Sequence, residues 1–574
     1  MTSRLVQPHG GRLVDLMAKG TRAAELKDAS RGWPSWTLTQ RQMCDLELLL
    51  VGAFSPLEGF MCRGDYENVC RDMRLEDGTL WPIPIELDVS DDLAPHLSVG
   101  SRLALRDPVG FMLGAIRVED LWEADLAEEA RLVYRTTSVE HPAVARLSGR
   151  NHRFYLGGRV EGIRLPRHYD FIEHRLTPLQ VRERFHALGW HRVAAFQTRN
   201  PMHRVHVELT LRAVRDIHAS LLIHPAVGET KPGDVDHFTR VRCYRKILER
   251  YPPHTAMLCL LPLAMRMAGP REALWHALIR QNYGCSHFIV GRDHAGPGRD
   301  SNGDLFYGPY EAQRLLEEHG GSMGIEIAAF EHMVYVEGLD RYMPEPEVRG
   351  GQEAKYISGS ELRRRLEDGR RIPEWFTYPE VAEELRRTYR PRCEQGLTVL
   401  FTGLPGAGKS TLANVLRVKL LEMGGRQVTL LDGDIVRRNL SSELGFSRSD
   451  RNTNIRRIGF VAGEITKSGG VAICAPIAPY GNVRRELRED IREVGGFVLV
   501  HVATPLEVCE ERDPKGLYAK ARDGMIEDFT GVSDPYEEPE DAEVRVDTAE
   551  ASPEECVQEV ILFLQREGYI GPGA

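Results

Sequence analysis

The sequence predicts a multidomain α/β protein with a mostly β N-terminal domain, a central α/β domain with a small appendage, and a C-terminal phosphate-loop domain with a parallel sheet. Three observations support this prediction. Short β-prone runs fill the first part of the chain, strand-like and helical runs alternate in the middle, and a Gly-x-x-x-x-Gly-Lys-Ser motif occupies residues 403–410. A chain of 574 residues can hold about three to five domains.

The composition is that of an ordinary globular protein, with 42% apolar and 28% charged residues. A net charge of −10 argues against nucleic-acid binding. Because the sequence has no run of 18 apolar residues and no signal-type core over residues 1–20, we expect no membrane partner and no signal peptide. The ten cysteines lack paired spacing, which favours reduced thiols in a cytoplasmic protein over disulfides or zinc.

Residues 1–168 are expected to form the β-rich domain, because β-prone runs such as Trp81–Val89 and Ser101–Ile116 are broken by Gly, Pro and Asp. In residues 169–330, strand-like runs alternate with helical patterns, which indicates a parallel α/β sheet. The expected strands of that sheet are Val193–Gln197, Ser220–His224, Ala256–Leu261 and His287–Val290.

Residues 331–390 are expected to form a small subdomain and linker, with a charged helix near Ser360–Asp368. Residues 391–574 then hold the phosphate-loop domain. Its motif follows the β-prone run Leu397–Phe401 and precedes the helical pattern Leu412–Leu421, a context that a chance Gly-rich turn would lack.

The first candidate site is the segment Gln197–His206, which lies between a strand-like run and the helical pattern Val207–Ile217. Ligands bind at such strand ends in open α/β sheets. His203 and His206 would share one face of the first helical turn and donate to a triphosphate, and Arg199 is a planar fork for a tetrahedral oxyanion. Two satisfied surface histidines remain an alternative, whereas zinc would need further ligands that are not evident.

The second candidate segment is Gly291–Gly298, which follows another expected strand and contributes the cation Arg292. Its glycines allow close approach of the backbone to a ligand. Two such segments at two strand ends of one sheet indicate a common anion site.

Residues 1 to about 390 resemble ATP sulfurylase (sulfate adenylyltransferase). The stretches that carry the resemblance are Gly52–Phe60, Gln197–His206, Leu222–Gly228 with Lys231–Asp234, Gly291–Gly298 and Ile357–Arg363. The resemblance implies a PUA-like N-terminal domain and a Rossmann-like nucleotidyltransferase domain.

This resemblance also implies roles for single residues. Sulfate would be held by Gln197, Arg199 and the backbone of Ala295, with His294 as a further substrate-binding residue. The ATP phosphates and the transition state would be held by Asn200, His203, His206 and Arg292, and the adenine would lie near Met333 and Val334. Val205 stands where the family usually has Ala, and we expect it to face away from the phosphates.

In the phosphate-loop domain, backbone N–H groups around Gly403, Gly406 and Gly408 can face phosphate oxygens, and the following helix adds its positive N-terminus. Lys409 can reach the β- and γ-phosphates, and Ser410 or Thr411 can hold Mg²⁺. After the strand-like run Val428–Leu431, Asp434 can bind Mg²⁺ or accept a proton from a hydroxyl; one Asp of Asp432-Gly-Asp434 is also expected to cap the next helix.

Residues 397 to about 565 resemble adenylyl-sulfate (APS) kinase through Gly403–Thr411, Leu431–Asp434, Leu444–Phe446, Asp450–Arg457, Asp513–Tyr518, Phe529–Gly531 and Asp534–Glu537. The resemblance implies that Asp434 activates the ribose 3′-hydroxyl. It further implies that Phe446 and Phe529 sandwich the adenine of APS, and that Lys515 belongs to a lid over the phosphates. The phosphosulfate would be held by Arg437, Arg451 and Asn454.

The chain departs from this pattern at Ala478, Gly481 and Asn482, where the family typically has Ser and Arg, while Arg484 and Arg485 could restore positive charge. One hypothesis is therefore a bifunctional enzyme that makes APS and pyrophosphate from ATP and sulfate and then phosphorylates APS to 3′-phospho-APS (PAPS). The alternative is a sulfurylase, run forward or in reverse to make ATP, with a weak or non-catalytic kinase-like regulatory module. Both imply Mg²⁺ with ATP, no zinc or organic cofactor, and a homo-oligomer.

Overall fold

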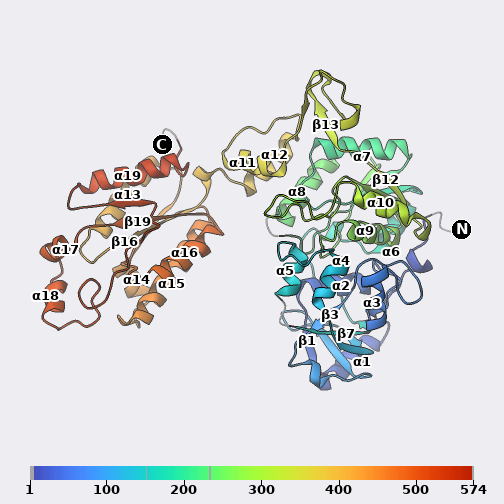
Figure 1. Ribbon diagram of the computed structural model, residues 1–574, viewed down its shortest axis with the longest axis horizontal. Coiled ribbons are helices and arrows are strands. Elements are labelled where there is room, and N and C mark those ends of the chain that lie inside the picture. Colours follow the sequence, from blue (N-terminus) through green and yellow to red (C-terminus); the bar gives the residue numbers. More distant parts are fainter. Residues whose placement is uncertain (1–4, 150–151, 232–233, 572–574) are drawn as a thin grey trace. The chain divides into compact units, whose positions relative to one another are not determined.

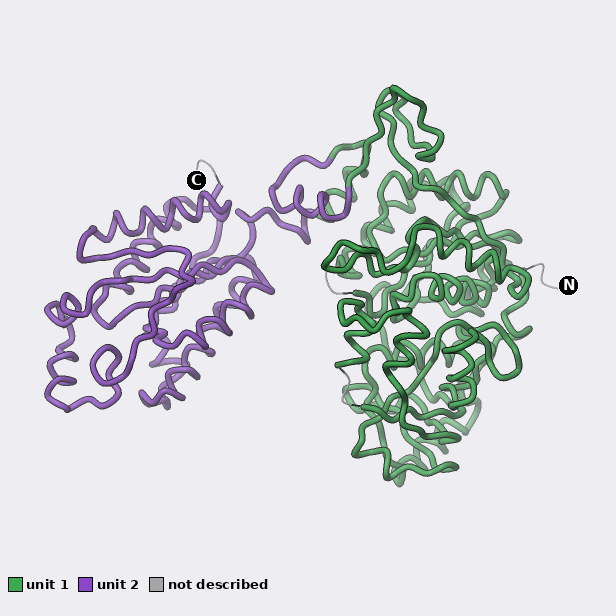
Figure 2. The backbone as a smooth tube through the Cα atoms, in the orientation of Figure 1, with its two compact units in different colours: residues 1–357, 373–385 green, residues 358–372, 386–574 purple. Residues whose placement is uncertain are grey.

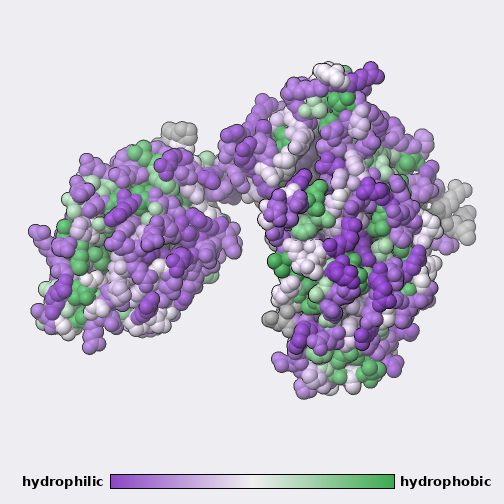
Figure 3. Space-filling view, viewed as in Figure 1, coloured by the Kyte–Doolittle hydropathy of each residue, from purple (hydrophilic) through white to green (hydrophobic). Residues whose placement is uncertain are grey.

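The computed structural model describes residues 5–149, 152–231 and 234–571. The chain divides into two compact units, residues 1–357 with 373–385 (unit 1) and residues 358–372 with 386–574 (unit 2), coloured separately in Figure 2. No helix among the described residues is long and apolar enough to cross a membrane. On the face drawn in Figure 3, hydrophilic residues predominate on both units.

The N-terminal part of unit 1 is built on a seven-stranded sheet in the order β1-β4-β5-β7-β2, with β3 and β6 also paired to β7. Its strands are β1 (Ser35–Thr37), β2 (Gly59–Phe60), β3 (Leu87–Val89), β4 (Arg102–Arg106), β5 (Met112–Arg117), β6 (Asp120–Glu123) and β7 (Phe154–Gly162). The helices are α1 (Arg22–Ala29), α2 (Gln40–Leu50), α3 (Arg63–Asp72), α4 (Leu126–Val133) and α5 (Pro142–Ser148). The β-rich prediction is confirmed, although only the last three residues of the run Trp81–Val89 form a strand.

The central part of unit 1 is a five-stranded parallel sheet in the order β10-β9-β8-β11-β12. The strands are β8 (Val193–Phe196), β9 (Ser220–Ile223), β10 (Ala256–Leu258), β11 (His287–Val290) and β12 (Glu326–Ala329). The four expected strands are confirmed, some of them shorter than expected, and β12 is an additional one. Because β9 and β11 lie on opposite sides of β8, the connections diverge between β8 and β11, and a crevice opens there.

The helices of this part are α6 (Pro178–Ala187), α7 (Arg204–Asp216), α8 (His237–Leu248), α9 (Pro270–Asn282) and α10 (Glu311–Glu318). Helix α9 is buried along its whole length apart from the partly exposed Arg271. A small antiparallel sheet follows, with β13 (Met333–Val336) between β14 (Arg341–Pro344) and β15 (Ala354–Lys355), and then α11 (Gly359–Glu367) and α12 (Pro379–Thr388). Helix α11 matches the expected charged helix.

Unit 2 contains a second five-stranded parallel sheet in the order β17-β18-β16-β19-β20. The strands are β16 (Leu397–Thr402), β17 (Val428–Asp432), β18 (Val471–Ala475), β19 (Gly496–Val502) and β20 (Val544–Val546). The helices are α13 (Lys409–Met423), α14 (Gly433–Asn439), α15 (Arg448–Lys467), α16 (Gly481–Arg492), α17 (Leu506–Arg512), α18 (Leu517–Arg522) and α19 (Pro553–Arg566).

The central strands β16, β18 and β19 are buried on both faces, which explains their nearly continuous apolar sequences, whereas the edge strand β17 is partly exposed. Helices α13 and α19 pack on one face together with Val399 and Phe401. Helices α15 and α16 pack on the other face with Leu400, so the sheet lies between two helical layers (Figure 1). The phosphate loop joins β16 to α13 at the carboxyl end of the sheet.

Candidate active sites

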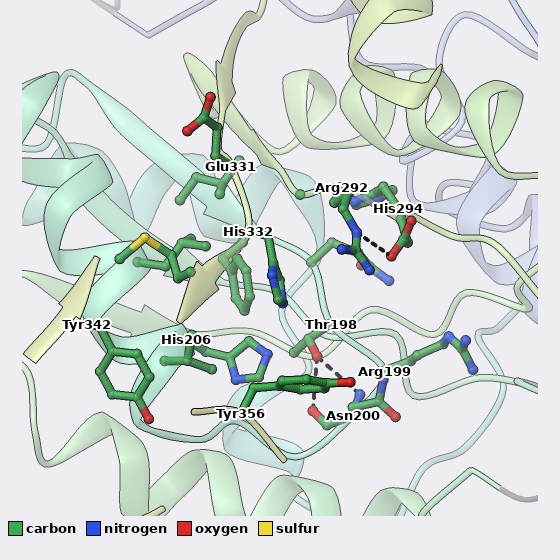
Figure 4. A pocket seen from close by; sticks show the side chains of 18 of the residues that line it. Thr198, Arg199, Asn200, His206, Arg292, His294, Glu331, His332, Tyr342 and Tyr356 are labelled. Atoms are coloured by element: carbon green, nitrogen blue, oxygen red, sulfur yellow. Dashed lines mark hydrogen bonds and ion pairs between the residues drawn. The ribbon is translucent and has the colours of Figure 1, made fainter. Parts of the chain in front are cut away.

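A cavity of about 380 Å³ lies at the carboxyl ends of β8 and β11 in unit 1. Figure 4 shows side chains of the segment after β8 and of the segment after β11 gathered around it. The residues that line it include eight of the expected site residues: Gln197, Arg199, Asn200, His206, Arg292, His294, Ala295 and Met333. The two segments singled out from the sequence therefore form one site.

Three expectations about this cavity need correction or refinement. Val205 lines the cavity, and the expectation that it faces away from the phosphates stays a prediction. His203 and Val334 are not among the residues that line it. His203 is instead the N-cap residue of α7. Its Nδ1 lies 3.0 Å from Thr377 Oγ1, and its ring packs against Phe376.

The structure adds lining residues that sequence reasoning missed: Thr198, Met265, His332, Tyr342, Lys355, Tyr356, Trp375 and Phe376. Most of them come from the small antiparallel sheet and the segment after it, which carry no recognisable local motif. Only their proximity to the stretch Ile357–Arg363 could have pointed to them.

Arg199 connects the two loops of the cavity. Its Nη1 donates to both carboxylate oxygens of Asp234 at 2.7 and 2.6 Å, and its Nη2 donates to Gly296 O at 3.3 Å. Asp234 was not expected as a site residue, although it belongs to one of the stretches that carry the resemblance. Because the carboxylate fixes the guanidinium, Arg199 is held in one orientation before any ligand arrives.

The two histidines are neutral at physiological pH. Burial lowers the pKa of His203 to about 3 and that of His206 to about 4. The backbone N–H of His203 donates to His206 Nδ1 at 3.0 Å, so the neutral His206 ring carries its proton on Nε2. His206 can therefore serve as a hydrogen-bond donor without adding charge.

Two further donors have no partner among the described residues. The side-chain amide of Asn200 is exposed and unpaired, and its backbone is fixed by the hydroxyl of Thr198. Ala295 has a φ of 55°, the left-handed region that alanine rarely adopts, and only its carbonyl is bonded, to Gly269 N–H at 3.2 Å. Such strain is typical of functional sites, where it aims a backbone group at a ligand.

In unit 2, the phosphate loop adopts a conformation that only glycine accommodates well. Gly403, Gly406 and Gly408 have φ values of 156°, 77° and 97°. The Lys409 ammonium folds over the loop and donates to Gly403 O at 2.9 Å and Leu404 O at 2.7 Å. Burial lowers the pKa of Lys409 to about 8, and an anionic ligand in the loop would reverse that shift.

The two aspartates after β17 have different roles. Asp432 caps α14 by accepting from Asp434 N at 3.0 Å, and its other oxygen accepts from Ser410 Oγ at 2.8 Å. Asp434 is exposed, and its carboxylate pairs with the ammonium of Lys515. The expected helix cap is thus Asp432. The Asp434 carboxylate takes no part in capping and is exposed near the carboxyl end of β17.

The expected APS-binding residues lie on neighbouring loops. The Arg437 guanidinium stacks 4.3 Å from the centre of the exposed Phe446 ring. Arg451 is buried and donates to Phe446 O, to Thr530 Oγ1 and to Asp528 O, so it ties the Phe446 loop to the Phe529 loop. Asn454 is also buried, and its Oδ1 has no partner among the described residues.

The departures from the kinase pattern are explained in part. Ala478 is buried with a φ of 46°. Arg484 is 4% exposed and donates to Ala478 O at 2.7 Å and Glu537 O at 2.6 Å, so its guanidinium is bound to the backbone, and the expectation that it compensates the lost charge stays a prediction. Gly481 N donates to Glu537 Oε2 at 2.6 Å, which places a carboxylate at the N-terminus of α16.

Two nucleotide-type sites on two parallel sheets define this chain as a phosphate-transferring enzyme with two centres. Family models match in the same arrangement: a PUA-like domain over residues 6–165, ATP-sulfurylase over 173–388 and adenylylsulphate kinase over 395–547. A sulfate adenylyltransferase of Aspergillus clavatus is 52% identical over 98% of this chain and 99% of its own length. One of Neurospora crassa is 51% identical over the same shares.

The solved structure entitled hexameric APS kinase from Thiobacillus denitrificans is 40% identical, with a TM-score of 0.81 over 99% of this chain and all of its own. The chain belongs to the sulfate adenylyltransferase family and carries an adenylylsulphate kinase domain at its C-terminal end.

Proposed function

We propose that this protein activates sulfate in two steps. Unit 1 transfers the adenylyl group of ATP to sulfate, forming APS and pyrophosphate, and unit 2 phosphorylates the 3′-hydroxyl of APS to give PAPS. Membership of the family over nearly the full length supports the first step. The kinase family match and the intact phosphate loop support the second.

The chemistry of unit 1 is a problem of bringing anions together. Sulfate is fully ionised near neutral pH, so its attack on the α-phosphorus needs no general base. Two unit charges 4 Å apart repel by about 1 kcal/mol in water and by about 4 kcal/mol at an effective dielectric constant of 20. Catalysis therefore requires fixed donors and positive charge where the two anions meet.

The observation that carries this proposal is the set of donors from two strand ends around one cavity. Arg199, Gln197 and the Ala295 N–H are proposed to hold sulfate. Arg292, Asn200 and the His206 Nε2–H are proposed to hold the ATP phosphates and to stabilise the charge that develops on them. His203 does not contact the ligand in this proposal; its backbone N–H donates to His206 Nδ1 and so orients the His206 ring.

We assign the adenine to the apolar side of the cavity. Met333 lines it, and Val334 follows in β13. His294 lies on the sulfate side, where its Nε2 is 3.1 Å from His276 Nδ1.

In unit 2, the loop N–H groups, Lys409, Thr411 and the lid residue Lys515 are proposed to hold ATP. Ser410 and Asp432 offer adjoining oxygens that suit Mg²⁺, which would neutralise phosphate charge when bound with ATP. Asp434 is proposed as the base that accepts the proton of the ribose 3′-hydroxyl, once nucleotide draws Lys515 away from it.

For APS, Phe446 and Phe529 are proposed to stack on the adenine, while Arg437 and Asn454 contact the phosphosulfate. Arg451 is assigned a positioning role through the two loops that it joins. A non-catalytic module is not favoured, because the loop, Asp434 and the kinase family match are all present. A homo-oligomer is proposed from the similar chain entitled hexameric.

Arg199→Ala tests the sulfurylase assignment. We expect sulfate-dependent pyrophosphate release to fall at least about 100-fold, the scale of a lost transition-state donor, because the variant loses its fixed cation. Phosphorylation of supplied APS by unit 2 should be unchanged, and a thermal melt like that of the parent would show that unit 1 of the variant is folded. Pyrophosphate release close to that of the parent would contradict the site.

A further inference from the structure

The buried helix α9 carries three polar side chains at four-residue spacing, Glu272, His276 and Arg280, each of them fully buried. Residues four apart share one face of a helix. None of the three lines the cavity of unit 1, and no sequence motif pointed to them.

Arg280 is the most unusual of the three. Its guanidinium is 0% exposed, and its hydrogen-bond partners among the described residues are the Gln197 side chain, His224 O at 2.9 Å and His276 O at 3.4 Å. None of the described Asp or Glu residues forms an ion pair with it. Burial lowers the pKa of Arg280 only to about 10, so the side chain stays cationic. An unpaired buried charge is costly, which indicates that it serves a purpose.

The contact with Gln197 supplies that purpose. Arg280 donates to Gln197 Oε1, which uses the acceptor end of the amide. Among the described residues, the donor end, Nε2, has only the weak acceptor Met265 Sδ at 3.9 Å, and both Gln197 and Met265 line the cavity. The amide therefore presents N–H groups, not oxygen, to whatever enters.

We propose that Arg280 is a positioning residue for sulfate, which locks the Gln197 amide with its donor end toward the anion. This inference rests on the proposed function of unit 1. Without Arg280, the amide could rotate and present Oε1, which would repel a dianion.

The other two residues of the same face hold further walls of the cavity. Glu272 accepts from Arg266 N and Ala268 N, both at 2.9 Å, and so fixes the loop that carries Met265. His276 Nδ1 lies 3.1 Å from His294 Nε2. Helix α9 thus contacts three parts of the cavity on the proposed sulfate side, namely Gln197, the loop of Met265 and His294, and holds them in place.

The test compares Arg280→Met with the parent full-length chain, using initial rates of pyrophosphate release. We expect the KM for sulfate to rise about tenfold or more, the scale of one charge-assisted hydrogen bond, while the KM for ATP changes less than about twofold. Met fills a similar volume, and replacing a buried charge by an apolar group is often tolerated. Arg280→Lys should restore part of the sulfate affinity, and it serves as the test if the Met variant does not fold.

Arg182→Met is the matched control, because Arg182 donates to backbone oxygens at the end of α9 but does not line the cavity. It should lower thermal stability without changing the KM for sulfate. Equal rises of both KM values in Arg280→Met, or an unchanged KM for sulfate, would overturn the inference.

A double-mutant cycle with Gln197→Ala separates the inference from the proposed function. Because Arg280 acts through Gln197, Arg280→Met should add little to the effect of Gln197→Ala. Additive effects would contradict positioning through this amide. If Gln197→Ala itself leaves the KM for sulfate unchanged, the sulfate assignment fails instead.

Discussion

The positive charge of the sulfurylase cavity comes from arginine rather than histidine. His203 and His206 stay neutral because burial lowers their pKa values to about 3 and about 4. Arg199 and Arg292 supply the charge at the surface of the cavity, and the buried Arg280 lies behind it. The histidines serve as aligned donors and supports.

The burial of His203 predicts a dependence of stability on pH. Because its pKa falls from 6.5 to about 3 on folding, the unfolded state binds the proton more readily between these values. The contribution of His203 to the free energy of unfolding should therefore be fully present above pH 6.5 and fall by up to about 1.4 kcal/mol per pH unit toward acid, in addition to the contribution of His206. Urea unfolding at several pH values measures this slope.

His203→Gln should make the slope shallower, whereas the same change at the exposed His96 should leave it as it is. A slope that His203→Gln does not alter would show that this ring binds its proton as readily in the folded protein as in the unfolded chain, which would contradict the lowered pKa.

At the level of elements, the phosphate loop depends on its glycines. A Cβ on Gly403 would lie 2.5 Å from Val502 O, in addition to the strained φ of 156°. Gly403→Ala should lower the melting temperature of unit 2 by several degrees, since a buried clash adds to strain of about 1–2 kcal/mol. Calorimetry measures the melting temperature. Pyrophosphate release by unit 1 should be unchanged in this variant.

Gly524→Ala is the control, because Gly524 has a φ of 71° with nothing within 4 Å of its added Cβ. Gly524→Ala should lower the stability only by the backbone strain of an alanine at positive φ, without a clash. Equal losses in the two variants would show that the contact with Val502 is unimportant.

The loops around Phe446 and Phe529 depend on one side chain. Arg451→Met removes the three hydrogen bonds by which this side chain joins them, so we expect the KM for APS to rise about tenfold, with little change in the KM for ATP. The exposed Arg438 makes no such contact with the part of the chain that the structure describes, and Arg438→Met should leave both values unchanged. A larger effect on ATP than on APS would argue against the positioning role.

Sequence patterns predicted the elements whose signals are local. The strands of both parallel sheets are short apolar runs, and the phosphate loop has fixed spacing, so each could be found without its neighbours. Asp234, Tyr356 and Arg280 could not be assigned, because their roles arise from contacts with residues far away in the chain. Asp432 was recognised as an alternative cap, but only the structure separates its role from that of Asp434.

At the scale of the whole molecule, the two sites lie in separate compact units, each with its own sheet and core. Loss of one centre should therefore leave the other intact. The product of unit 1 is the substrate of unit 2, so removal of APS would draw the unfavourable first step forward.

The most direct test of the account follows labelled sulfate through the purified full-length chain with ATP and Mg²⁺, separating the products by ion-exchange chromatography. The account predicts label in PAPS for the parent chain, label that stops at APS in Lys409→Ala and in Asp434→Asn, and no labelled nucleotide in Arg199→Ala. PAPS formed at the parent rate by the Lys409 variant, or no PAPS formed by the parent while APS accumulates, would contradict it.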